Sequence, residues 1–201
     1  MKMVRRFTGA LAAAALMVAV PGAAIAGWKV MAPHQPVLVG KSTLKVTPGI
    51  EWNRSSARPG PSAEMWTVDG LALNELLFVG GVAPGATLIK DRHKKDRPLP
   101  RFAANMLAPD IVQLYEGTIR NAVATSLFEI DNVAPAKLAG HDGVHFTFHY
   151  AVQDEDLRRN GEARAAVIGG KLYLIAFQGP ALHYFGAGIG EARAIMDSAA
   201  M

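Results

Sequence analysis

Apolar residues alternate in two strand-like runs between Glu162 and Phe177, and these runs meet at Gly169-Gly170. A Gly-Gly pair accepts the positive φ angles of a two-residue hairpin turn, so we expect Ile168 to pair with Lys171. The resulting ribbon is apolar on one face and largely apolar on the other, which predicts a position in the middle of a sheet covered on both faces. The first face holds Ala163, Ala165, Val167, Leu172, Leu174 and Ala176; the second holds Arg164, Ala166, Ile168, Lys171, Tyr173, Ile175 and Phe177.

Further strands are predicted before this hairpin. Val37 to Val46 has a strand-like pattern, and Glu64 to Val79 predicts a second hairpin that turns at Asp69-Gly70. In that hairpin Val68 would lie opposite Leu71, with Trp66 as an anchor of the core. Two more strands are expected after it, from Leu127 to Leu138 with an interruption at Pro135, and from Val144 to Val152. The outer face of the strand from Val144 to Val152 would carry His145, Thr147, His149 and Ala151.

Two helices are predicted from apolar stripes at helical spacing. The first begins at Pro109-Asp110, because proline suits a first turn and aspartate suits the positive end of a helix. The second runs from about Ile189 to Ala199, with Arg193 and Asp197 as an exposed i, i+4 pair. Gly186, Gly188 and Gly190 would let the chain turn sharply into it. The stripes are Ile111, Leu114, Tyr115, Ile119 and Ala122, and Ile189, Ala192, Ile195, Met196 and Ala199.

This order of elements predicts an α+β domain, a mainly antiparallel sheet with helices packed on both faces. It resembles the PsbP-like α/β/α sandwich fold in its strand pair with Trp66, its long strand Lys171 to Phe177, and its terminal helix with Ser198 near the end. The segments EMWTVDG (Glu64 to Gly70) and LPRF (Leu99 to Phe102) are similar to those of uncharacterised exported bacterial proteins. The resemblance implies an accessory or binding role without catalysis. A helix-grip fold around an apolar cavity is the alternative.

The first 26 residues have the plan of a secretory signal peptide: Lys2, Arg5 and Arg6, an apolar run, then Ala24-Ile25-Ala26 before Gly27. We therefore expect a single mature domain, residues 27–201, in the bacterial periplasm or outside the cell, without a stable membrane span. The signal contains three of the 21 basic residues and none of the 17 acidic ones, which leaves 18 and 17. A mature net charge of +1 gives no support for nucleic-acid binding. The absence of cysteine excludes disulfides and lipoprotein acylation.

The histidines are the main candidates for metal ligands or catalytic groups in the sequence. His145 and His149 share a strand face but lie about 13 Å apart at roughly 3.3 Å per residue, too far to bind one zinc ion together. His183 lies on the final apolar run of the chain, and a neighbouring strand can bring it near His149. There is no cysteine and no Gly-x-Ser-x-Gly motif, so a nucleophilic site would have to assemble in space. Asp154-Glu155-Asp156 lacks the spacing of a calcium loop. We expect no cofactor and no resident metal.

The densest charge lies between Lys90 and Arg101, the basic loop, which holds six basic and two acidic residues. It is expected to be a solvated loop or a contact for an acidic partner or anionic headgroups. Three functions remain open: an accessory or binding protein with an unknown envelope partner, a carrier of a small apolar ligand with Phe146, Phe148, Tyr150 and Tyr173 around its cavity, and a hydrolase or metal enzyme. Candidate contact residues for a partner or ligand are His145, His149, His183, Trp66, Lys94, Lys95 and Arg97.

Overall fold

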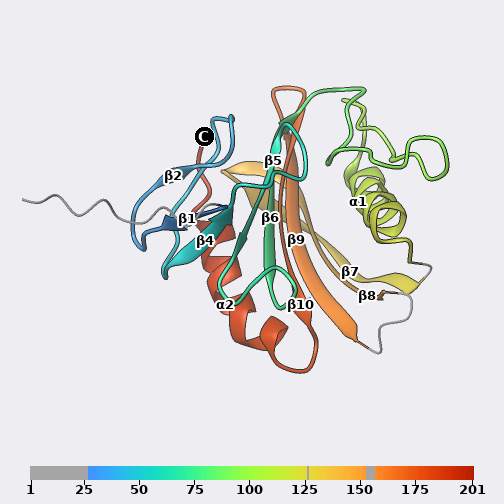
Figure 1. Ribbon diagram of the computed structural model, residues 1–201. Helices are drawn as coiled ribbons and strands as arrows, with labels where there is room; N and C mark the ends of the chain where they lie inside the picture. Colours follow the sequence, from blue (N-terminus) through green and yellow to red (C-terminus); the bar gives the residue numbers. More distant parts are fainter. Residues whose placement is uncertain (1–26, 126, 153–156) are drawn as a thin grey trace, which may run out of the picture.

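The computed structural model describes residues 27–125, 127–152 and 157–201, so the expected signal peptide and Asp154-Glu155-Asp156 lie outside the described residues. The described residues form an α+β fold, with a mainly antiparallel sheet and two helices (Figure 1). Eight strands form one sheet in the order β1-β4-β5-β6-β10-β9-β8-β7, and β2 pairs with β3 in a separate ribbon. The strands are β1 (Trp28–Met31), β2 (Val37–Leu38), β3 (Lys45–Val46), β4 (Trp52–Ser55), β5 (Ala63–Thr67), β6 (Glu75–Val82), β7 (Leu127–Leu138), β8 (His141–Ala151), β9 (Arg158–Ile168) and β10 (Lys171–Pro180); the helices are α1 (Ala108–Val123) and α2 (Tyr184–Asp197).

The hairpin at Gly169-Gly170 is confirmed in position and register. Lys171 pairs with Ile168, and the pairing continues to Pro180 opposite Arg159. Gly169 and Gly170 have φ angles of 57° and 75°, the left-handed region that favours glycine. The strands are longer than predicted, because β9 begins at Arg158 and takes in part of the expected loop. The hairpin lies inside the sheet, with β6 on one side and β8 on the other.

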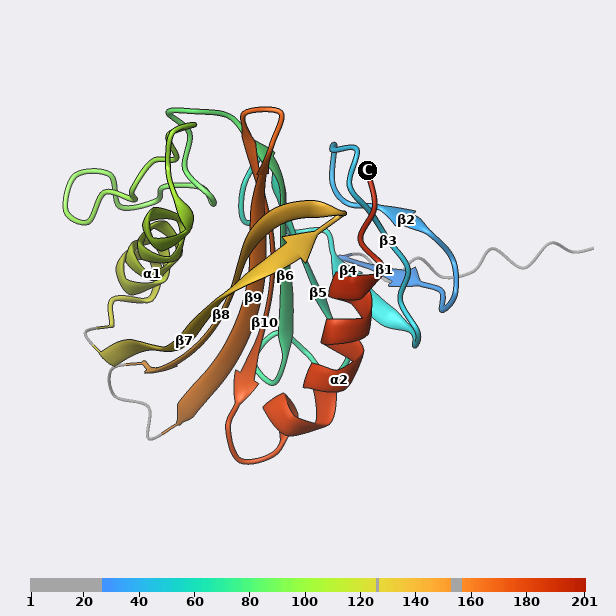
Figure 2. The same ribbon diagram turned by 180° about the vertical axis from the view of Figure 1, so that it is seen from behind.

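Side chains from the two faces of this hairpin enter two different hydrophobic clusters. Leu172, Leu174 and Ala176 lie in a cluster with residues of α1, whereas Tyr173, Ile175 and Phe177 lie in a cluster with residues of α2. Figures 1 and 2 show the two helices on different sides of the long strands. In the first cluster the ring centroid of Tyr115 lies 5.4 Å from that of Phe146. Tyr173 belongs to the other cluster, so the four aromatic residues of the carrier hypothesis do not surround one space.

The predicted hairpin at Asp69-Gly70 has the wrong register. Trp66 pairs with Leu76, so the connection between β5 and β6 spans seven residues instead of two. Asn74 explains the longer loop, because its side-chain oxygen accepts hydrogen bonds from Thr67 Oγ1 at 2.7 Å and from the backbone N–H of Val68 at 2.9 Å. A side chain thus takes the backbone donors that a tight turn would have used.

The strand predicted to break at Pro135 is continuous. β7 runs from Leu127 to Leu138 and has a register shift between Ile130 and Asn132. It is the last strand in the sheet order, where a proline removes no hydrogen bond to a further strand. The following turn is also tighter than predicted: it occupies Ala139-Gly140, and β8 begins at His141.

Helix α2 begins at Tyr184, five residues before the predicted start, so the three glycines lie inside it. The glycine at 188 has a packing reason, because a Cβ there would lie 2.5 Å from the ring of Phe177. The predicted buried stripe is confirmed for Ala192, Ile195 and Met196. In α1 the stripe is also found, except that Ala122 is exposed.

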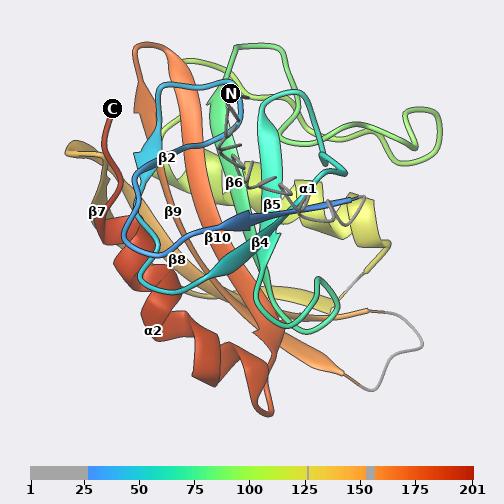
Figure 3. The same ribbon diagram turned by 60° about the vertical axis from the view of Figure 1, so that its left-hand side comes forward.

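The segment Val37 to Val46 forms two short strands and a connecting turn instead of one strand. Ser42 holds this turn, since its hydroxyl donates a hydrogen bond to the carbonyl oxygen of Val39 at 2.7 Å. The C-terminal residues return to the same place: Ala200 and Lys45 exchange backbone hydrogen bonds of 3.0 and 2.8 Å. Figure 3 shows the C-terminus beside this blue ribbon. Within the described ranges, neither helix has the length and apolar character that crossing a membrane requires.

Candidate functional site

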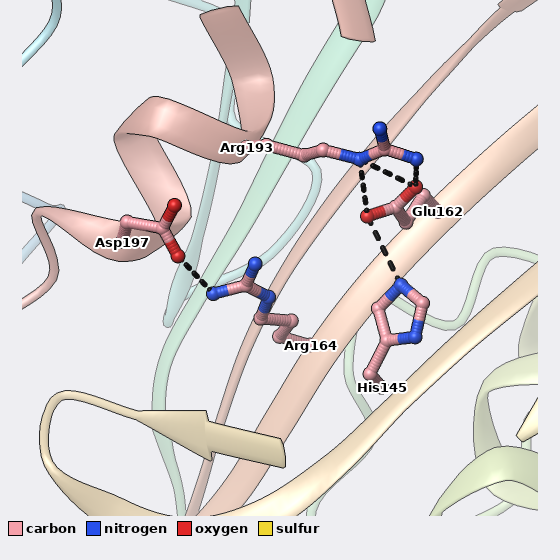
Figure 4. Close-up of polar contacts among 5 residues, drawn as sticks. All are labelled: His145, Glu162, Arg164, Arg193 and Asp197. Carbon is pink, nitrogen blue, oxygen red and sulfur yellow. Dashed lines mark hydrogen bonds and ion pairs between the residues drawn. The ribbon is translucent and has the colours of Figure 1, made fainter. Parts of the chain in front are cut away.

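A polar cluster lies between the sheet and α2 (Figure 4). His145 is on β8, Glu162 and Arg164 are on β9, and Arg193 and Asp197 are on α2. The pairing of His145 with Arg164 and of Thr147 with Glu162 brings the two strands into register. Because side chains two residues apart share a face, this register collects His145, Glu162 and Arg164 on the side that α2 approaches.

Glu162 is the centre of the cluster and is only 2% exposed. Arg193 binds it in a bidentate manner, with Nη2 donating to Oε2 at 2.7 Å and Nε donating to Oε1 at 3.0 Å. The Nε2 atom of His145 lies 3.0 Å from Oε1. Asp197 pairs instead with Arg164, so the predicted pairing of Arg193 with Asp197 is wrong. Each of the two ion pairs therefore joins α2 to β9, and neither lies along the helix.

The pKa of Glu162 lies below its ordinary value. Burial alone would raise it, but the hydrogen bonds from Arg193 and His145 and the charge of Arg193 outweigh burial and favour the carboxylate. A carboxylate held by two donors is a weak proton acceptor. The cluster therefore fits a structural ion pair that joins α2 to β9 better than an acid–base pair.

A His–Glu pair also forms part of many nucleophilic sites, which need a hydroxyl or thiol next to the histidine. Among the described residues no serine or threonine hydroxyl is hydrogen-bonded to His145, and the sequence has no cysteine. The hollow beside the cluster, about 310 Å³, is lined by Pro135, Ala136, His145, Glu162, Arg164 and Arg193. None of these side chains is a nucleophile of that kind.

The other two histidine candidates lie apart from this cluster. His149 has Nδ1 2.7 Å from Asp131 Oδ1 and Nε2 3.5 Å from Glu129 Oε2, so both ring nitrogens face carboxylates on β7. His183 is exposed just before α2, with its ring against Tyr184. Within the described ranges no three histidine, aspartate or glutamate side chains are grouped so as to bind a metal ion.

Trp66 is fully buried. Its Nε1 donates a hydrogen bond of 3.0 Å to Glu64 Oε1, and its ring packs against Phe78 with a centroid distance of 4.6 Å. Trp66 is therefore the core anchor that the sequence predicts. It lies too deep to meet a partner at the surface.

The basic loop is a loop, as predicted, and lies beside α1 (Figure 1). Lys94 and Lys95 are exposed and Arg97 is half-buried. The backbone is held by several contacts, among them Asn121 Nδ2 donating to the carbonyl oxygen of Pro98 at 2.7 Å and the backbone N–H of Leu99 donating to Asp91 Oδ2 at 3.2 Å. The side chain of Leu99 is buried. The loop is therefore anchored at Pro98 and Leu99, next to the segment that carries its cations.

Two hollows adjoin the basic loop. The α1 hollow, about 230 Å³, has an apolar lining that includes Met65, Ile89, Leu99 and Ala122, and charged groups from Arg58, Lys90, Asp91, Arg92 and Arg97. The β6 hollow, about 310 Å³, is lined by Val82 and Ala86 together with Lys90, Asp91, Lys94 and Arg101. They share Lys90 and Asp91 and so adjoin one another. Charge density in the sequence identified the loop, but the contributions of Arg58 and α1 required the fold.

A half-buried acid, Glu75, was not singled out from the sequence. It lies at the start of β6, paired with Gln178, whose Nε2 donates a hydrogen bond to Glu75 Oε1 at 3.1 Å. Burial raises the pKa of Glu75 to about 7, partly opposed by the charge of Arg159 and the hydrogen bond from Gln178. Burial and the nearby Tyr150 and Glu75 also raise the pKa of Tyr115. This acid lies on the face of the sheet that packs against α1, away from the cluster at Glu162.

No protein-family model matches the chain, and no curated protein matches it in sequence. Among solved structures, the fold is similar to that of cyanobacterial PsbP (CyanoP) from Synechocystis sp. PCC 6803, with 14% identity, a TM-score of 0.49, and coverage of 91% of this chain and 97% of that one. It is also similar to LpqN of Mycobacterium tuberculosis, described as involved in cell envelope biogenesis, with 12% identity, a TM-score of 0.38, and coverage of 86% and 90%.

Proposed function

We propose that this chain is an exported accessory protein that binds an acidic partner through its basic loop and carries out no catalysis. The observation that carries the proposal is the absence of ion pairs at cations of the basic loop and of the two hollows beside it. Arg58, Lys90, Arg92, Lys94, Lys95 and Arg97 take part in no ion pair with any described residue. By contrast, Arg193 and Arg164 are paired with carboxylates. Cations that form no ion pair within the described residues suit recognition of an external anion.

The two alternative functions have less support. The hydrolase hypothesis would rely on His145 and Glu162, but this carboxylate is already paired with Arg193, and no serine or threonine hydroxyl of the described residues is hydrogen-bonded to the histidine. The carrier hypothesis needs an empty apolar chamber, whereas the rings of Phe128, Phe148 and Tyr150 stack on one another with centroid distances of 5.1 and 5.8 Å from Phe128. Aromatic rings at these distances are in packing contact.

The scaffold beneath this surface is best interpreted as three layers, with α1 over one face of the sheet and α2 over the other. The division of the core into two clusters supports this interpretation. In such an arrangement the basic loop lies at the α1 face and the Glu162 cluster at the α2 face. The two sites therefore do not share side chains, and each can be altered by substitution without touching the other.

Export is the second part of the proposal, and it rests on the three-part pattern of residues 1–26. The mature chain would begin at Gly27 and function in the periplasm or outside the cell. Intact mass of the protein recovered from outside the cytoplasm would give a chain starting at Gly27. A full-length mass in the membrane fraction would contradict export with cleavage.

The binding part is tested by affinity capture from the envelope of the source cell. Three immobilised proteins are compared: wild type, the loop variant Lys94→Glu/Lys95→Glu/Arg97→Glu, and a control variant of equal net charge, Lys29→Glu/Lys45→Glu/Lys171→Glu, in which exposed lysines outside the loop are changed. We expect an acidic protein that is retained by wild type and control, lost from the loop variant, and eluted by salt. Equal retention by the loop variant would contradict the proposal. A co-purifying lipid would instead support the carrier hypothesis.

A further inference from the structure

We infer that the α1 hollow takes an apolar anchor side chain from an extended acidic segment of the partner protein. This inference rests on the proposed function and specifies what the basic loop recognises. Its ligand class is an acidic peptide segment with one bulky apolar residue. Charge alone would not require such a residue, so the inference can fail while the proposed function stands.

The lining of the α1 hollow combines two kinds of chemistry. Its wall is apolar, formed by Met65 from β5, Ile89 and Leu99 from either end of the loop region, and Ala122 from α1. Around this wall lie four cationic side chains and one carboxylate, a formal net charge of +3. An occupant that satisfies both must place an apolar group inside and negative groups around it.

The volume favours a side chain over a complete small ligand. The α1 hollow holds about 230 Å³, below the roughly 300–1,000 Å³ of pockets that enclose drug-sized ligands. An interface anchor needs less space, because the rest of the segment lies outside the hollow. Buried aromatic anchors surrounded by polar contacts are the common form of binding hot spots.

The second hollow favours an extended segment. Because Lys90 and Asp91 line both hollows, a chain leaving the α1 hollow passes directly to the β6 hollow, whose border adds Lys94 and Arg101. Arg101 is oriented by its own hydrogen bond, in which Nη1 donates to the carbonyl oxygen of Gly85 at 2.6 Å. Acidic residues on either side of the anchor would therefore meet cations in both hollows, with Asp91 as the one carboxylate at their shared border.

The test uses fluorescently labelled synthetic peptides and measures affinity by fluorescence anisotropy at low ionic strength. The first peptide alternates glutamate and glycine and has a central tryptophan; the second has alanine in place of tryptophan; the third has lysine in place of glutamate. The variant Ala122→Leu fills part of the hollow without changing charge. Ala187→Leu makes the same change at an exposed position of α2 and is the matched control.

We expect the tryptophan peptide to bind wild type and Ala187→Leu about tenfold more tightly than the alanine peptide. In Ala122→Leu this advantage should disappear, while the weaker binding of the alanine peptide stays. Backbone amide NMR shifts upon binding the tryptophan peptide should be largest at Ile89, Leu99 and Ala122. These shifts locate the anchor independently of the variant.

The outcomes separate the inference from the proposal on which it rests. Equal affinity of the two acidic peptides, or an undiminished tryptophan advantage in Ala122→Leu, would overturn the anchor and leave the acidic partner standing. If neither acidic peptide binds more tightly than the lysine peptide, the proposed function itself fails. Binding of phosphatidylglycerol vesicles without binding of either acidic peptide would overturn both in favour of a membrane surface.

Discussion

Arg193 and Glu162 form a bidentate ion pair that joins α2 to β9, with the carboxylate only 2% exposed. The Arg193 side chain is 53% exposed, so one partner of the pair is buried and the other is partly in water. Breaking such a pair leaves an uncompensated buried carboxylate, which costs more than the pair itself contributes. This relationship makes Arg193 a stability determinant at a place where the sequence suggested only an exposed helix pair.

Replacing Arg193 by methionine should lower the free energy of unfolding by about 1–3 kcal/mol, because Glu162 then keeps only His145 as a partner. Urea unfolding at pH 7 measures this. Arg164→Met is the matched control. Its partner Asp197 is 66% exposed, so this variant should lose less than about 1 kcal/mol of unfolding free energy.

The effect of Arg193→Met should also depend on pH. The pKa of Glu162 is lowered in the folded state, so the stability it contributes is present above an ordinary pKa of 4.5 and is lost as pH falls. The unfolding free energies of Arg193→Met and Arg164→Met should therefore converge in acid. Equal losses of unfolding free energy in the two variants at pH 7 would contradict a buried ion pair at Glu162.

Glu75 predicts the opposite dependence on pH. Its pKa is raised to about 7 in the folded state by burial, so the folded protein holds this proton more tightly than the unfolded chain does. Its contribution to stability should be full below pH 4.5 and decline as pH rises to about 7, by up to about 3 kcal/mol. Arg159, Gln178 and Tyr115 are the groups that face it. Gln178 also has a buried Oε1 that accepts no hydrogen bond from any described residue, which suits a protonated acid nearby.

The measurement is the difference in unfolding free energy between wild type and Glu75→Gln at several pH values from 4.5 to 8. The variant should gain on wild type as pH rises, because glutamine stays neutral throughout. Glu51→Gln makes the same substitution at an exposed position and is the matched control. A constant difference across the range would show that Glu75 titrates as an ordinary surface acid.

Two glycines of α2 should respond oppositely to alanine. A Cβ at 188 would lie 2.5 Å from the ring of Phe177, which is fully buried, so Gly188→Ala should destabilise the protein by about 1–3 kcal/mol. A Cβ at 190 meets nothing within 4 Å, and alanine is the better helix former, so Gly190→Ala should stabilise by about 0.5–1 kcal/mol. Thermal unfolding of both variants checks the pair. A shift of the same sign in both would mean that α2 does not pack against Phe177 as described.

The central hairpin could be predicted because its turn is local and its alternation is strong. Gly169-Gly170 fixed the register, and the two apolar faces followed from it. The connection after Thr67 could not be predicted, because the side chain of Asn74 accepts hydrogen bonds from Thr67 and Val68 and so favours a longer loop. The alternation of apolar and polar residues gives no information about such a side-chain hydrogen bond. Pro135 was misjudged for a related reason: a proline is harmless on an edge strand, and only the complete sheet order shows which strand is the edge.

The same limit applies to the sites. His145 and Glu162 are 17 residues apart, and only the register between β8 and β9 brings them onto one face. The basic loop was identified from its charge density, because that property is local. The α1 hollow was not, since its wall combines Met65, Leu99 and Ala122, which come together only when α1 is placed against the sheet.

The central claim, recognition through the basic loop, is tested most directly by site-specific photo-cross-linking in the source cell. Photo-reactive benzoylphenylalanine is placed at Lys95 in the exported chain, and in a control at Lys45, which is also an exposed lysine but lies on β3. We predict one discrete protein adduct from position 95, with an acidic partner, that disappears when Lys94 and Arg97 are also changed to glutamate. An adduct that persists in that variant, or that forms equally from position 45, would contradict the account.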